Sequence, residues 1–117
     1  MKTFIATIGI GKGTWGKVKR ICSEEWDKII VLGNEWARDT FKLDFPFQWI
    51  LLDEQKDVCQ LVDDIVGQLP EDIDEIYVNL ISGSGREHVA LLSSLLANNK
   101  TFKTVCVCDD GIKYYGV

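Results

Sequence analysis

The sequence has 117 residues, 46% hydrophobic and 26% charged, with a formal net charge of −5 at pH 7. This length suits a single domain, 1–117, whose core needs no disulfide bonds, and the composition excludes intrinsic disorder. The negative charge excludes a general nucleic-acid groove, which needs a basic stripe, so we expect no binding of long nucleic acids. No apolar run approaches membrane-span length and no signal peptide begins the chain, so we expect a cytoplasmic protein without membrane contact.

Strand and helix patterns alternate along the chain. Short apolar, β-branched runs predict strands, and apolar residues at intervals of three and four predict helices. In chain order we predict a strand at 3–10, a helix through 18–22, a strand at 28–32, a helix at 35–41, a strand at 45–52, helices at 55–69 and 86–96 on either side of a strand at 76–81, and strands at 101–108 and 112–117. In the helix at 86–96, we expect a wide apolar face formed by Val89, Leu92 and Leu96 with Ala90, Leu91 and Leu95 beside them.

This alternation predicts an α/β fold, a single three-layer Rossmann-like domain with a mostly parallel six-stranded sheet. Right-handed crossovers favour the strand order 3-2-1-4-5-6, and the turn signal at 109–111 makes the last strand antiparallel. In that order the loops after the first and fourth strands meet at the topological switch point, where open α/β sheets bind ligands. These loops, 9–16 and 82–85, are the two richest in glycine. We therefore expect the functional site there.

The loop after the fourth strand combines small residues with two basic ones. Glycines at 83 and 85 let backbone N–H groups approach an anion, and the following helix adds the positive end of its dipole. Arg86 and the chain's single histidine, His88, bring side-chain donors to the same place. A tight turn alone also explains such a loop, and it is not a Walker A sequence. The candidate ligand-binding residues are Gly9, Gly11, Lys12, Gly13, Thr14, Trp15, Asn34, Ser82, Gly83, Ser84, Gly85 and Arg86.

Residues 11–16 formally match the dinucleotide fingerprint Gly-x-Gly-x-x-Gly, with Glu35 about twenty residues further on. A bulky Trp15 inside that turn and the short chain, which leaves no room for a substrate domain, weigh against NAD(P) binding. Dinucleotide binding, or an interaction module without any ligand, remains the alternative function.

Two other chemistries have weaker signals. Ser82, Ser84, His88 and Asp109 are residue types of a hydrolase triad, but the nucleophile-elbow motif Gly-x-Ser-x-Gly is absent. The four cysteines lack the paired spacing of a zinc site, since only Cys106 and Cys108 lie close together. We expect buried free thiols, no metal and no cofactor.

The fourth strand and its loop resemble the motif of the CRISPR-associated Rossmann fold (CARF) family. That motif has an asparagine or similar residue, two apolar residues, a small-residue loop and a polar residue that opens the helix. Asn79, the residues 82–85 and Arg86 match it. The resemblance covers the whole chain in its order of elements, but in sequence it covers the two loops alone.

The resemblance implies a homodimer that binds a cyclic oligoadenylate, often the tetra-adenylate, across its two-fold axis in antiviral signalling. Because no effector domain follows Val117, we expect a stand-alone member: a sensor, a slow, metal-independent ring nuclease or a relic. Ring cleavage would use the ribose 2′-hydroxyl as nucleophile and needs positioning and a charge-stabilising donor. Lys12, Arg86 and His88 are the candidate catalytic residues, and Trp15 is a candidate to stack on adenine or to pack in the core.

Overall fold

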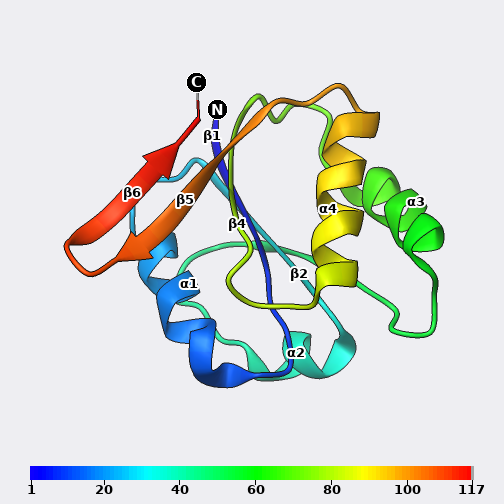
Figure 1. The fold of residues 1–117 in the computed structure, drawn as a ribbon, viewed down its shortest axis with the longest axis horizontal. Helices are drawn as coiled ribbons and strands as arrows, with labels where there is room; N and C mark the ends of the chain where they lie inside the picture. The colour runs from blue at the N-terminus through cyan, green and yellow to red at the C-terminus, as the bar shows by residue number, and fades with distance from the viewer. Residues whose placement is uncertain (117) are drawn as a thin grey trace.

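The computed structural model describes residues 1–116 and contains one six-stranded sheet in the order β3-β2-β1-β4-β5-β6. Strands β1 to β5 are parallel and β6 is antiparallel to β5, which confirms the order predicted from the sequence. The predicted last strand includes Val117, which lies outside the described residues. The elements are β1 (Lys2–Thr7), the 3-10 turn η1 (Lys12–Thr14), α1 (Trp15–Cys22), β2 (Lys28–Gly33), α2 (Glu35–Thr40), β3 (Gln48–Leu51), α3 (Val58–Gln68), β4 (Glu75–Asn79), α4 (Gly85–Ala97), β5 (Phe102–Cys108) and β6 (Gly111–Tyr115), as shown in Figure 1.

Strand β1 lies at the centre of the sheet, between β2 and β4. Ile5 pairs with Ile30 on one side and with Val78 on the other, and all three side chains are fully buried. Because successive side chains of a strand point to opposite faces, Ile5 and its neighbour Phe4 enter different cores. A continuous apolar run is what a strand covered on both faces requires.

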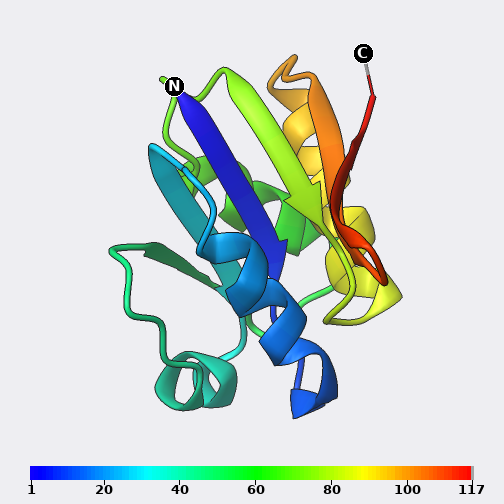
Figure 2. The same cartoon turned by 90° about the vertical axis from the view of Figure 1, so that its left-hand side faces the viewer.

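Each face of the sheet has its own hydrophobic core. Helices α3 and α4 cover one face, while α1 and α2 cover the other (Figure 2). The first core contains Leu61 and Ile65 of α3 with Leu91 and Leu95 of α4, and the second contains Val18 and Ile21 of α1 with Ala37 and Phe41. This layering leaves the carboxyl edge of the sheet to the connecting loops.

Three predicted elements are shorter in the structure. Strand β1 ends at Thr7, not at residue 10, and β3 spans Gln48–Leu51 within the predicted 45–52. Helix α3 begins at Val58, not at residue 55, because Asp57 and Gln60 form a reciprocal capping box that sets the helix start. In the two strands, apolar residues continue beyond the part that pairs in the sheet, whereas residues 55–57 of the predicted helix are polar and precede or form its cap.

The outer side of α4 differs from the prediction. Val89 is 53% exposed and Leu96 65% exposed, so the part of the expected apolar face that packs on the sheet is formed by Ala90, Leu91 and Leu95. The core side also includes Ser94, whose hydroxyl donates a 2.6 Å hydrogen bond to the carbonyl of Ala90. That bond satisfies the buried hydroxyl and lets a polar residue occupy a core position.

The expectation of four buried thiols is wrong for three of them. Cys22 is buried, and burial raises the pKa of its thiol to about 12. Cys59 is exposed near the start of α3, while Cys106 and Cys108 are half-buried on β5. Within residues 1–116, no group of three or more His, Cys, Asp or Glu side chains is placed to hold a metal ion.

Candidate functional site

A cleft of about 530 Å³ opens at the carboxyl ends of β1 and β4. Its walls include both glycine-rich loops, so the two predicted loops do meet at the switch point. Of the predicted binding residues, Gly9, Gly11, Thr14, Asn34, Ser82, Gly83, Ser84 and Arg86 line the cleft. Lys12, Gly13, Trp15 and Gly85 do not line it, and neither does His88.

Ser82 joins the two loops. Its hydroxyl oxygen accepts a 2.8 Å hydrogen bond from the backbone N–H of Gly9. Its carbonyl accepts from the hydroxyl of Thr7 and lies 2.8 Å from Nε2 of His88. A carbonyl cannot donate, so His88 carries its proton on Nε2 in this arrangement. Ser82 and His88 therefore hold the loops in place, and His88 presents no free Nε2 to the cleft.

Gly9 and Gly83 are required by the close approach of the two loops. A Cβ on Gly9 would lie 2.8 Å from both the Cα and the backbone nitrogen of Gly83. Gly83 itself has a φ of +98°, and a Cβ there would lie 3.0 Å from Oγ1 of Thr7. Close packing of one loop on the other thus explains these two glycines without a ligand.

The start of α4 is closed by a capping box. The Ser84 hydroxyl accepts from the N–H of Glu87 at 3.3 Å, and the Glu87 carboxylate accepts from the N–H of Ser84 at 2.8 Å. The N–H groups of Gly85 and Arg86 belong to the first helical turn, where the helix offers no backbone acceptor. These two donors are the part of the helix start that a ligand can use.

Arg86 is tied to the loop between β3 and α3. Its guanidinium donates one hydrogen bond to the carbonyl of Glu54 at 2.9 Å and another to the carbonyl of Lys56. The Glu54 carboxylate in turn accepts from the side-chain amide of Asn34, which caps α2 by accepting from the N–H of Ala37 at 2.8 Å. A chain of side-chain contacts thus runs from α4 through the loop to α2. The sequence suggested a free Arg86, but its planar fork already has two acceptors.

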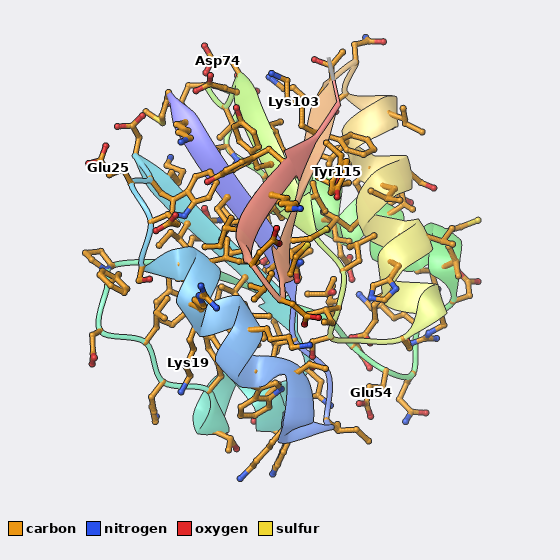
Figure 3. The ribbon with its side chains drawn as sticks, turned by 60° about the vertical axis from the view of Figure 1, so that its left-hand side comes forward. Lys19, Glu25, Glu54, Asp74, Lys103 and Tyr115 are labelled. Atoms are coloured by element: carbon orange, nitrogen blue, oxygen red, sulfur yellow. The ribbon has the colours of Figure 1, made fainter. Side chains whose placement is uncertain are left out.

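Glu54, Glu87, Leu52 and Leu61 also line the cleft but were not predicted as site residues. Residues 52–54 follow the parallel strand β3 at the same edge of the sheet. The principle that ligands bind at the carboxyl ends of parallel strands therefore applies to them as well as to the two glycine-rich loops. Figure 3 shows Glu54 at the end of the molecule opposite Asp74, which precedes β4. The charged lining therefore consists of two carboxylates and one guanidinium, with buried leucines beneath them.

Lys12 and Trp15 lie beside the cleft. Trp15 is only 6% exposed, packs against Trp36 and Phe41, and donates through Nε1 to the carbonyl of Gly9 at 3.1 Å. Of the two roles considered for Trp15, the structure places it in the core. The ammonium of Lys12 lies 5.6 Å from the ring centre of Trp36 and 5.9 Å from that of Trp15, a cation–π arrangement on an exposed loop.

The dinucleotide fingerprint lacks its structural context. The segment after Gly11 forms the turn η1, and a Cβ on Gly11, Gly13 or Gly16 would meet nothing within 4 Å. None of these three has a positive φ. Glu35 is exposed on α2 and does not line the cleft. The glycines here do not serve the close contacts that the fingerprint demands.

A hydrolase triad is not assembled among the described residues. Nε2 of His88 faces the carbonyl of Ser82, and Asp109 is exposed in the β5–β6 turn. The Ser84 hydroxyl takes part in the capping box with Glu87. Neither Ser82 nor Ser84 is thus placed as a nucleophile beside a base.

No protein-family model matches the chain, and neither does any curated protein. Among helices in the described part of the chain, 1–116, none is both long and apolar enough to cross a membrane.

Proposed function

We propose that this protein binds a cyclic oligoadenylate, the tetra-adenylate foremost, as a homodimer in CRISPR antiviral signalling in the cytoplasm. The observation that carries the proposal is the cleft at the switch point, walled by the same two loops that resemble the CARF motif. Its volume of about 530 Å³ lies in the range of small-molecule sites. A ring of four nucleotides has two equivalent halves, which suits two identical clefts related by a two-fold axis.

The lining supplies groups for each part of a nucleotide. The N–H group of Arg86 at the start of α4 suits a phosphodiester, with the N–H of Gly85 next to it just outside the lining. The exposed side chains of Ile10 and Ile81 in the lining suit the apolar faces of adenine, and the Glu87 carboxylate suits its amino group or a ribose hydroxyl, since both are donors. The carboxylates of Glu54 and Glu87 repel a phosphate deep in the cleft, so the phosphates belong beside Arg86.

Exposed apolar side chains around the cleft support a dimer with facing clefts. Ile10 is 69% exposed and Ile81 41% exposed, and both line the mouth. Trp36 on α2 is 44% exposed as well. Trp49 does not add to this exposed surface, because it is half-buried and donates to the carbonyl of Gly33. Such residues commonly mark interaction surfaces.

Between sensing and ring cleavage, we favour sensing. Cleavage needs a free donor or base aimed at the reacting phosphodiester. The guanidinium of Arg86 and Nε2 of His88 both face backbone carbonyls, and the ammonium of Lys12 lies over tryptophan rings. The groups that cleavage would need are thus engaged with other parts of this protein, which favours sensing.

A thermal-shift screen tests the proposal. Cyclic tri-, tetra- and hexa-adenylate, linear tetra-adenylate and NAD are compared on the same preparation. A ligand at about one hundred times its Kd stabilises the folded state by about 2.7 kcal/mol and raises Tm by roughly 10 °C in a domain of this size. We expect that shift with a cyclic oligoadenylate and none with NAD. A shift with NAD alone supports the dinucleotide alternative, and no shift with any of them leaves an interaction module.

A further inference from the structure

The loop between β3 and α3, residues 52–57, forms one wall of the cleft and depends on side chains from elsewhere for its position. Arg86 of α4 donates to its carbonyls at Glu54 and Lys56, and Asn34 donates to the Glu54 carboxylate. Within the loop, the N–H groups of Gln55 and Lys56 bond to Asp53. Arg86 is thus the clamp that fixes this wall to α4.

The same guanidinium lines the cleft and is half-buried there. Its present partners are neutral carbonyls. A phosphodiester offers the same two-pronged geometry with a negative charge, and charge-assisted bidentate bonds are about twice as strong as neutral ones. Glu54 is exposed, so water can solvate its carbonyl once Arg86 leaves.

A second observation acts in the same direction. The loop that Arg86 holds also carries the Glu54 carboxylate into the lining of the cleft. A phosphate entering the cleft is repelled by that carboxylate while the loop is clamped. Release of the loop removes the repulsion at the moment when Arg86 gains its new partner, so the two changes favour each other.

We propose that Arg86 exchanges its partners when an anionic ligand binds. In the empty protein it clamps the carbonyls of Glu54 and Lys56, and in the occupied protein it holds a phosphate and releases the loop 52–57. The loop then carries the signal of occupancy to the surface. The identity of the ligand rests on the proposed function above, whereas the exchange itself requires only a phosphate group.

Hydrogen exchange of the amides at 53–57, followed by mass spectrometry, tests this inference. The probes are cyclic tetra-adenylate and, separately, inorganic tripolyphosphate, and the variants are Arg86→Ala, Arg86→Lys and Glu54→Gln. Either probe should accelerate exchange of this segment about ten-fold in the wild-type protein, because two bonds to a charged donor are lost. Arg86→Ala should show that faster exchange without a probe, with no further change on adding one.

The other two variants keep the test decisive if Arg86→Ala does not fold. Arg86→Lys retains the charge without the fork, so it should exchange faster than wild type when empty. Glu54→Gln keeps the acceptor for Asn34 but loses the charge, so it should bind tripolyphosphate several-fold more tightly while its empty loop exchanges as in wild type.

The outcomes separate the two proposals. A cyclic adenylate that raises Tm but slows or does not alter exchange at 53–57 overturns the partner exchange and leaves the proposed function standing. Faster exchange with tripolyphosphate, without any effect of cyclic adenylates, supports the exchange and removes the proposed ligand. If neither probe changes Tm or exchange, both proposals are wrong.

Discussion

Replacing Gly9 by alanine should force apart the two loops that form the cleft. The added methyl group would lie 2.8 Å from backbone atoms of Gly83, and backbone cannot turn aside as a flexible side chain can. Overpacking of this kind costs about 1–3 kcal/mol. Loss of the 2.8 Å bond from the Gly9 N–H to Ser82 adds about 1 kcal/mol. We therefore expect the free energy of unfolding to fall by about 2–4 kcal/mol.

Urea unfolding measures this loss directly, and the same loop provides matched controls. Gly11→Ala and Gly13→Ala place their methyl groups in open space at ordinary φ values. Each should therefore change the free energy of unfolding by less than about 1 kcal/mol, in either direction. The midpoint should fall in Gly9→Ala at an unchanged m value. Equal stability of all three variants would refute the close approach of the loops. A large loss in Gly11→Ala and Gly13→Ala instead would revive the dinucleotide fingerprint.

Three further predictions concern other parts of the molecule. Arg86→Ala should lower the free energy of unfolding by about 1–3 kcal/mol, since it leaves two loop carbonyls without a donor, and it should weaken binding of the cyclic ligand. Urea unfolding measures the first effect and calorimetric titration the second. A variant as stable as wild type would show that the clamp is absent. Cys22 in the folded state keeps its proton up to a pKa of about 12, whereas the unfolded chain loses it above 9.0, so between these values a rise in pH favours unfolding. Between these pH values the free energy of unfolding of wild type should therefore fall by up to about 1.4 kcal/mol per pH unit more than that of Cys22→Ala. If the free energies of unfolding of the two proteins change with pH in the same way, the burial of the thiol is contradicted. The double variant Ile10→Asp, Ile81→Asp should convert the proposed dimer to a monomer in light scattering while the protein stays folded by circular dichroism, because both side chains are exposed. An unaltered dimer would place the interface elsewhere.

Local patterns in the sequence were enough to predict the fold and the meeting of the two glycine-rich loops. Strands such as the one around Ile5 are continuous apolar runs because they are covered on both faces, and this signal needs no knowledge of partners. Alternation of strands and helices, with right-handed crossovers, then leaves few sheet orders open. The switch point follows from the order alone, so the two glycine-rich loops could be paired before any coordinates were known.

Tertiary structure alone decided what each side chain at the site does. Arg86 meets carbonyls about thirty positions earlier in the chain, and Gly9 meets Gly83 across the sheet edge. Lys12 lies over Trp36, an aromatic partner from α2. Hydrogen bonds and close contacts depend on distances of a few tenths of an ångström, which are set when separate loops pack together. A residue type shows which bonds a side chain is able to make, but the fold determines which partner reaches it first.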